Sequence, residues 1–136
     1  SGGGYPLMGT SRTHLGINRA LCGEVVSVGD GTATARLAAL PEMAADDLGL
    51  VHGGFVFGLA DYAAMLAVND PNVVLGAADV KFVAPVRVGD VVDAEASVTD
   101  EKGRRRSVEV LARVGDRTVL TGVFTTFVLD RHVLDS

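Results

Sequence analysis

Hydrophobic and polar residues alternate near the start of the chain, give way to a nearly continuous hydrophobic stretch in the middle, and alternate again towards the end. Residues 20–28 and 32–40 each have the periodicity of a half-buried strand. The glycines and aspartate at 29–31 between them are typical of a tight hairpin turn. The sequence therefore predicts a pair of antiparallel strands at the beginning of the domain.

A nearly continuous apolar stretch follows at residues 54–69, after a loop at 41–50 that is rich in alanine and aspartate. Its length favours a helix over a strand. Asp70 and Pro71 end this helix, because proline cannot extend a helix and disfavours helical angles in the residue before it. A helix that is apolar on all sides must be covered on several sides, so we expect it at the centre of the fold.

Four further strands are predicted after the helix. In the second of them Val92 and Ala94 alternate with polar residues, which is typical of an antiparallel strand with one buried face. In the last, the period of two places Leu120 and Phe124 on one face and Val119 on the other. Short turns rich in glycine, aspartate or proline separate the four predicted strands, which are 73–84, 91–98, 105–114 and 118–129.

Two strands, one long apolar helix and four more strands predict an α+β fold in which one antiparallel sheet wraps around a central helix. Such a sheet keeps an outer face and two free edges, and dimerisation through an edge would protect one of them. The 136 residues are enough for a single domain, which we expect over residues 13–136. The glycine-rich start suggests a flexible tail or processing scar over residues 1–12.

Composition narrows the class of function. A net charge of −5 gives no electrostatic footprint for nucleic acid. We expect neither a membrane span nor a signal peptide, because no apolar run has the required length or flanks. One cysteine, Cys22, excludes an intrachain disulfide and fits a reducing compartment, which predicts a cytoplasmic protein. His14 and His132 have no companion at the spacing of metal ligands, so no metal site is expected.

A single carboxylate, Asp61, lies in the middle of the predicted helix, and His52, Gly53 and Gly54 stand at its start. Burying a carboxylate is unfavourable unless it is paired or used in chemistry. The combination therefore favours a catalytic site. The structural alternative is that the glycines only allow the helix to approach the sheet closely, while Asp61 pairs with a residue of the sheet.

These features together resemble the hotdog fold. The motifs that carry the resemblance are the strand hairpin, the His-Gly-Gly start of a helix that contains Asp61, and Phe82-x-x-Pro85-x-x-x-Gly89-Asp90. Within that fold the chain is similar to the PaaI-like acyl-CoA thioesterases of the 4-hydroxybenzoyl-CoA thioesterase superfamily, over residues 15–129. The resemblance implies hydrolysis of an acyl-CoA thioester to the free acid and coenzyme A, with no cofactor or metal.

The resemblance also implies roles for the residues of the helix. The N–H group of Gly53 would stabilise the oxyanion that forms on the thioester carbonyl, because the first N–H groups of a helix lack internal partners. Asp61 would act as general base on water or as nucleophile. Gly54 would contribute to substrate binding, and His52 would support the loop and the glycine amide.

Asp46 departs from the family pattern, which often has Asn or Gln near this position to hold the attacking water or the carbonyl. A carboxylate cannot donate a hydrogen bond unless it is protonated. The departure predicts either altered water positioning and substrate choice or, equally, a solvated loop without a catalytic role.

Spacing along the helix predicts an assembly. Gly53 and Asp61 are eight residues apart, which is about 12 Å along a helix axis. One substrate carbon cannot lie within reach of both groups of the same chain. The donor and the acid of one site should therefore come from different subunits of an obligate homodimer. The resemblance implies the same arrangement, with dimers that pair into tetramers.

The strand after the helix supplies the remaining candidates. The resemblance implies that it lines the channel for the pantetheine arm, and basic residues near it are candidates for the nucleotide phosphates of coenzyme A. Ion pairing at the surface of the sheet explains the same charges equally well. The predicted substrate-binding residues of this region are Asp79, Val80, Lys81, Phe82, Val83 and Arg87; residues 104–106, an arginine run, are better explained as a solvated end.

Two other functions compete with the hydrolase. A non-catalytic acyl-CoA-binding or sensing module is one, because residues 81–90 resemble the hotdog effector domain of a malonyl-CoA-responsive repressor. Asp46 favours this sensor, whereas Asp61 and the expected lack of a DNA-binding segment oppose it. A hydratase or dehydratase of the same fold is disfavoured, because such enzymes place a histidine and an acid over one carbon and no matching spacing is present.

Overall fold

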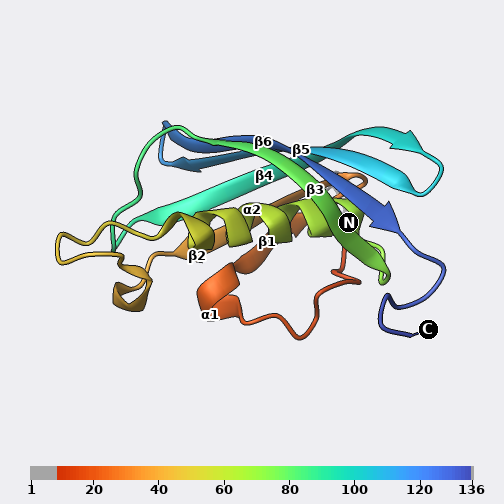
Figure 1. Ribbon diagram of the computed structural model, residues 1–136, viewed down its shortest axis with the longest axis horizontal. Coiled ribbons are helices and arrows are strands. Elements are labelled where there is room, and N and C mark those ends of the chain that lie inside the picture. Colours follow the sequence, from red (N-terminus) through yellow and green to blue (C-terminus); the bar gives the residue numbers. More distant parts are fainter. Residues whose placement is uncertain (1–8, 136) are drawn as a thin grey trace, which may run out of the picture.

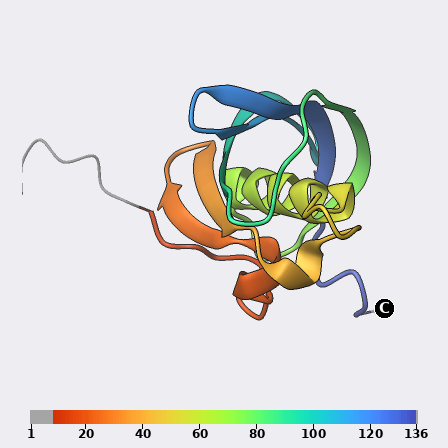
Figure 2. The same cartoon turned by 90° about the vertical axis from the view of Figure 1, so that its left-hand side faces the viewer.

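A six-stranded antiparallel sheet curves around one long helix in the computed structural model, which describes residues 9–135 (Figures 1 and 2). The strand order is β1-β2-β4-β5-β6-β3, so β1 and β3 form the two edges. The predicted α+β hotdog architecture is confirmed. In chain order the elements are α1 (Arg19–Cys22), β1 (Glu24–Val28), β2 (Thr32–Ala38), η1 (Pro41–Met43), α2 (Gly53–Val68), β3 (Val73–Phe82), β4 (Val91–Lys102), β5 (Arg105–Val114) and β6 (Arg117–Val128).

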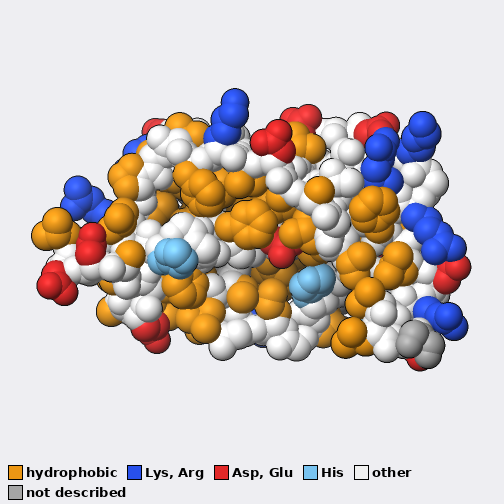
Figure 3. Space-filling model, in the orientation of Figure 1, with side chains coloured by type: hydrophobic (Ala, Val, Ile, Leu, Met, Phe, Trp, Pro, Cys, Tyr) orange, Lys and Arg blue, Asp and Glu red, His pale blue; other side chains and the backbone are white. Residues whose placement is uncertain are grey.

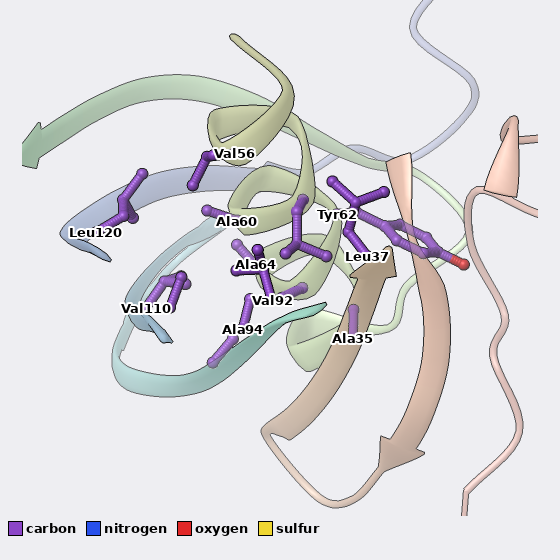
Figure 4. Close-up of a cluster of buried hydrophobic side chains, with 14 of the residues drawn as sticks. Ala35, Leu37, Val56, Ala60, Tyr62, Ala64, Val92, Ala94, Val110 and Leu120 are labelled. Carbon is purple, nitrogen blue, oxygen red and sulfur yellow. The ribbon is translucent and has the colours of Figure 1, made fainter. Parts of the chain in front are cut away.

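Helix α2 forms the centre of the core. Leu59, Ala63 and Leu66 are fully buried along it, and the inner faces of β2, β4 and β5 cover it. Figure 4 shows the side chains of α2 interdigitating with those of the strands. The helix begins and ends one residue earlier than predicted. Asn69 takes the left-handed conformation (φ 52°) just after its last turn, as is common at a helix C-terminus.

The strands bury alternate residues, as predicted. Ala94 and Ala96 of β4 point to the helix together with Val108 and Val110 of β5, and all four are buried. Small side chains on β4 let α2 lie close to the sheet, which fixes the helix relative to the strands.

The prediction of a strand at 20–28 is wrong for its first residues. Residues 19–22 form the short helix α1, and β1 begins only at Glu24. The side chain of Asn18 accepts a hydrogen bond from the N–H of Leu21 at 3.1 Å. This N-cap stabilises a helical turn where the apolar residues alone indicate a strand.

The prediction that Val119 lies on the opposite face from Leu120 is also wrong, because both side chains are buried. Register explains the difference. Ala112 of β5 pairs with Leu120, whereas Arg113 pairs with Thr118, so Val119 is an extra residue in β6. A β-bulge of this kind turns an additional side chain inward.

Part of the tail predicted over residues 1–12 lies outside the described residues. In its described part, the N–H of Gly9 donates to the carbonyl of Val28 at 2.7 Å, and the N–H of Arg12 donates to the side chain of Asn69 at 2.7 Å. These bonds attach residues 9–12 to β1 and to the end of α2. Across residues 9–135, no helix combines the length and hydropathy needed to cross a bilayer.

Candidate active site

Asp61 lies halfway along α2, on the side of the helix that the sheet leaves partly open. On this face of the molecule hydrophobic side chains gather over α2, and an acidic side chain lies among them (Figure 3). The Oδ1 atom of Asp61 is buried, and no hydrogen-bond partner for it exists among the described residues. The carboxylate is therefore unpaired in an apolar setting.

This environment changes the acid's protonation. Burial raises the pKa of Asp61 to about 6, because removal from water disfavours the charged form. A carboxylate with a pKa near neutrality is a stronger base than an exposed one, and it is still ionised at pH 7. The site thus has a group suited to removing a proton from water.

The first turn of α2 offers free hydrogen-bond donors. His52 precedes the helix in an extended conformation (φ −61°, ψ 131°), and its side chain does not cap it. Among the described residues, nothing accepts a hydrogen bond from the N–H groups of Gly53 and Gly54. Unpaired N–H groups at the positive end of a helix dipole favour a developing negative charge.

The ring of His52 adds no donor to the N–H groups of Gly53 and Gly54. His52 is exposed, its ring packs edge-on against Phe55 at 6.2 Å, and its backbone N–H donates to the carbonyl of Met43. A β-carbon on Gly54 would come within 3.1 Å of the ring. The histidine therefore packs over the glycine turn, and no carboxylate within residues 9–135 orients it as a base would need.

A small cavity opens beside the first turn of α2, and we name it the first-turn pocket. Its volume is about 270 Å³. Phe82 lies over Gly53, since a β-carbon on that glycine would be 3.3 Å from the phenyl ring. The lining is apolar apart from the backbone and consists of Val51, Gly53, Val56, Phe82, Ala84, Pro85, Val86 and Val119. Sequence reasoning found Gly53 and Phe82 but missed the rest of this lining, because the other residues come from separate segments that meet only in the fold, and Val119 enters it through the bulge in β6.

Gly53 and Asp61 do not meet within one chain. Both belong to the continuous helix α2, so about 12 Å of helix axis separates them. The first-turn pocket and the buried carboxylate therefore lie at different places along the helix.

Asp46 lies in the loop before α2 and is exposed. Its Oδ1 atom accepts hydrogen bonds from the N–H groups of Leu48 at 2.9 Å and Leu50 at 3.2 Å. This is a loop-stabilising arrangement of the kind that short acidic side chains make in turns. Asp46 also borders a second cavity, of about 350 Å³, together with Pro85 and Arg87.

The candidates on β3 divide between two faces of the sheet. Asp79 and Lys81 face away from α2 and line a cavity on the outer surface with Glu95 and Glu109. Val80, next to them in sequence, is half-buried. Phe82 and Val83, at the end of the strand, are more than half exposed and lie near the start of α2.

The basic candidates also differ from one another. No carboxylate oxygen of the described residues lies within 4 Å of a side-chain nitrogen of Lys81 or Arg87. The arginine run at 104–106 is occupied by ion pairs, which are Arg104 with Asp130, Arg105 with Asp100 and Arg106 with Glu101. Within residues 9–135 no group of three or more potential ligands is placed to hold a metal ion.

Curated relatives match parts of longer proteins. The methylthioribose-1-phosphate isomerase of Aquifex aeolicus is 52% identical over 120 residues, which cover 88% of this chain but 26% of that protein. The transcription factor FapR of Thermoanaerobacter sp. strain X514 is 31% identical over 85 residues, which cover 62% of this chain and 42% of that protein. The chain thus spans about a quarter to two fifths of these relatives.

Solved structures match over nearly the whole chain. The uncharacterized protein PH1136 from Pyrococcus horikoshii is 47% identical with a TM-score of 0.94, and the match covers 95% of this chain and 99% of that one. A mutant of the phenylacetic acid degradation protein PaaI from Thermus thermophilus is 27% identical with a TM-score of 0.75, covering 82% and 96%. The family model described as "Thioesterase superfamily" matches residues 48–121, from the loop before α2 to the middle of β6. With this match over more than half of its length, the chain belongs to the thioesterase superfamily.

Proposed function

We propose that the protein is an acyl-CoA thioesterase, which hydrolyses an acyl-CoA ester to the free acid and coenzyme A. The observation that carries the proposal is Asp61, a half-buried carboxylate whose buried Oδ1 atom has no partner among the described residues, on a helix whose first N–H groups are also free of partners among those residues. A thioesterase-type function is what the family indicates. The acyl-CoA substrate is the further step proposed here.

The reaction needs a base and an oxyanion site. Asp61 would take a proton from water as the water oxygen attacks the thioester carbon, and the N–H groups of Gly53 and Gly54 would hold the resulting oxyanion. Collapse of the tetrahedral intermediate would re-form the carbonyl, break the carbon–sulfur bond and release the thiolate of coenzyme A. The proton held by Asp61 can then be passed to the thiolate, which restores the base.

A homodimer would bring these groups together. The helix places Asp61 about 12 Å from Gly53, so two copies of α2 side by side would combine the acid of one subunit with the donors of the other. Gly58, one turn before Asp61, supports this arrangement. A β-carbon at Gly58 would meet nothing within 4 Å, so packing within the chain does not explain a glycine that lowers helix stability.

The edge strand β3 supports the same dimer. Ala77 and Ala78 are small and exposed in its middle, and the charged side chains of Asp79 and Lys81 that follow them face away from α2. An edge of this kind is suited to pairing with a second strand. Two copies joined through β3 would extend the sheet and place the open sides of their α2 helices towards each other. Such dimers could pair further into the expected tetramer.

A second candidate function is acyl-CoA binding without turnover. The similarity to FapR, a transcription factor, favours it. The two candidates differ in the fate of the ester: a sensor would bind an acyl-CoA and release no thiol, and its Asp61 would not be needed as a base.

Thiol release from a panel of acyl-CoA esters tests the proposal. The panel spans short, medium, branched, aromatic and dicarboxylic acyl groups and is run on the wild type and on Asp61→Ala, with Asp116→Asn, at an exposed turn between β5 and β6, as a matched control that also alters one acid. We expect turnover of at least one ester and a loss of about 1,000-fold in kcat for Asp61→Ala only. Equal turnover in both proteins would reject Asp61 as the base, and binding without thiol release would favour the sensor.

A further inference from the structure

We infer that the first-turn pocket holds the acyl group of the substrate, and that it selects an uncharged acyl chain of short to medium length. The inference rests on the proposed function, since it assigns the part of the ester that lies next to the oxyanion donors. It assigns contact with the acyl chain to residues that were not among the substrate-binding residues predicted from the sequence, above all Ala84, Val86 and Val119.

The first-turn pocket lies beside the proposed oxyanion donor. Gly53 is at once the first residue of α2 and part of the pocket lining. A thioester carbonyl that accepts a hydrogen bond from the start of α2 has its acyl chain attached to the same carbon. The first-turn pocket, which Gly53 itself lines, is placed to receive that chain, and the exposed Phe82 lies over Gly53.

The lining of the first-turn pocket is apolar. No charged side chain lines the pocket, and Val86 and Val119 at its base are buried. An acyl group that ends in a carboxylate would lose its hydration there without gaining a cation, which is strongly unfavourable. The acid of the proposed site, Asp61, would repel such a group as well. The pocket therefore favours neutral acyl groups over dicarboxylic ones.

The size of the first-turn pocket limits the length of the acyl chain. A volume of about 270 Å³ corresponds to about nine water-sized groups at ~30 Å³ each. Part of that space is the mouth of the pocket, so acyl chains of roughly four to eight carbons fill the remainder. Shorter chains would leave the apolar lining uncovered, and longer chains would extend into solvent.

The test compares kcat/KM across a series of CoA esters. The series contains acetyl, butyryl, hexanoyl, octanoyl and dodecanoyl esters, with malonyl and succinyl esters as anionic members. Ala84→Leu narrows the pocket at a half-buried loop position, and Val86→Ala widens it from the base. Val25→Leu, on the exposed edge strand β1, is the matched control. A circular dichroism melt identifies any variant that does not fold.

For the wild type we expect the highest kcat/KM between four and eight carbons, with anionic esters at least about 100-fold lower than neutral ones of similar length. Ala84→Leu should lower kcat/KM for the octanoyl ester at least about tenfold and leave the acetyl ester within about twofold. Val86→Ala should shift the optimum to longer chains, and Val25→Leu should change nothing. An unchanged length profile in both pocket variants, or malonyl turnover equal to butyryl turnover, would overturn the inference.

Failure of the proposed function gives a different result. In that case no ester releases thiol in an Asp61-dependent way, and the same series is measured by calorimetric binding. A binding optimum at four to eight carbons that Ala84→Leu shortens would still support the acyl pocket. Binding that ignores chain length in every variant would reject it.

Discussion

Asp61 is tolerated on an apolar helix because it lies where the sheet stops covering that helix. The side chain is half-buried, yet one of its oxygens has lost contact with water and has no donor among the described residues. An acid held only for structure would be expected to have a hydrogen-bond partner, because an unsatisfied buried oxygen destabilises the fold. No described residue therefore holds this oxygen in place, which leaves it available to a bound molecule or to a second subunit.

The raised pKa of Asp61 predicts the pH dependence of catalysis. A base must be ionised, so kcat/KM should be constant above about pH 7 and fall as the pH drops through the pKa of about 6. At pH 5 the loss should be about tenfold, because roughly one tenth of the acid is then ionised. Initial rates with one CoA ester between pH 4.5 and 8.5 measure this. A profile that stays flat down to pH 5 would show that the essential acid has an ordinary pKa.

At the scale of elements, the proposed mechanism makes the start of α2 a hydrogen-bond donor. It requires the N–H group of Gly53 and does not require that this position lack a side chain. Replacing Gly53 by proline and by alanine tests these two properties separately. Proline fits the first position of a helix, and the residue before it, His52, already has the extended conformation that proline requires.

Gly53→Pro removes the N–H donor, whereas Gly53→Ala keeps the donor and adds a methyl group near Phe82. We expect Gly53→Pro to lower kcat about 100-fold or more with a melting temperature near that of the wild type. Gly53→Ala, the matched control, should retain much more activity. If both variants lose activity equally, the effect is one of packing against Phe82 and the donor is not needed.

The open side of α2 carries a second prediction, at Gly58. A β-carbon there meets no atom of the described residues within 4 Å, so Gly58→Leu should leave the monomer folded. In the proposed dimer it would separate the paired helices, and the dissociation constant should rise at least about tenfold. Sedimentation equilibrium on both proteins measures this. A more stable protein with unchanged association would show that no second copy covers this side of α2.

Elements of the fold and parts of the site differ in how far the sequence determines them. The period of the apolar residues was sufficient for the six strands, apart from the first residues of the predicted first strand, because the sheet buries one face against the helix. Helix α2 is apolar on all sides, so its length identified it. Neither signal was sufficient for Val119, whose inward orientation depends on a bulge set by pairing with a neighbouring strand. The first-turn pocket could not be predicted, because residues from the start of α2, the segment after β3 and β6 meet there only in the folded chain. Asp61 was found because a lone acid in an apolar run is conspicuous in the sequence.

At the scale of the whole molecule, the two edges of the sheet are unequal. Edge strand β1 is five residues long, and edge strand β3 is ten residues long with small exposed side chains at its centre. The longer edge offers more unpaired backbone groups, so β3 is the edge that we expect to pair. Pairing there would make the dimer, and not the single chain, the unit that contains a complete site.

Complementation between inactive subunits tests this account most directly. Asp61→Asn and Gly53→Pro are each expected to be inactive alone, and they are mixed in equal amounts under conditions that allow subunits to exchange. If the site combines Asp61 of one subunit with the α2 start of the other, half of the dimers are mixed and each has one intact site, so the mixture should recover about a quarter of the wild-type activity. Light scattering and mass spectrometry confirm that mixed dimers have formed. Mixed dimers with no more activity than the two variants apart would contradict a site shared between subunits.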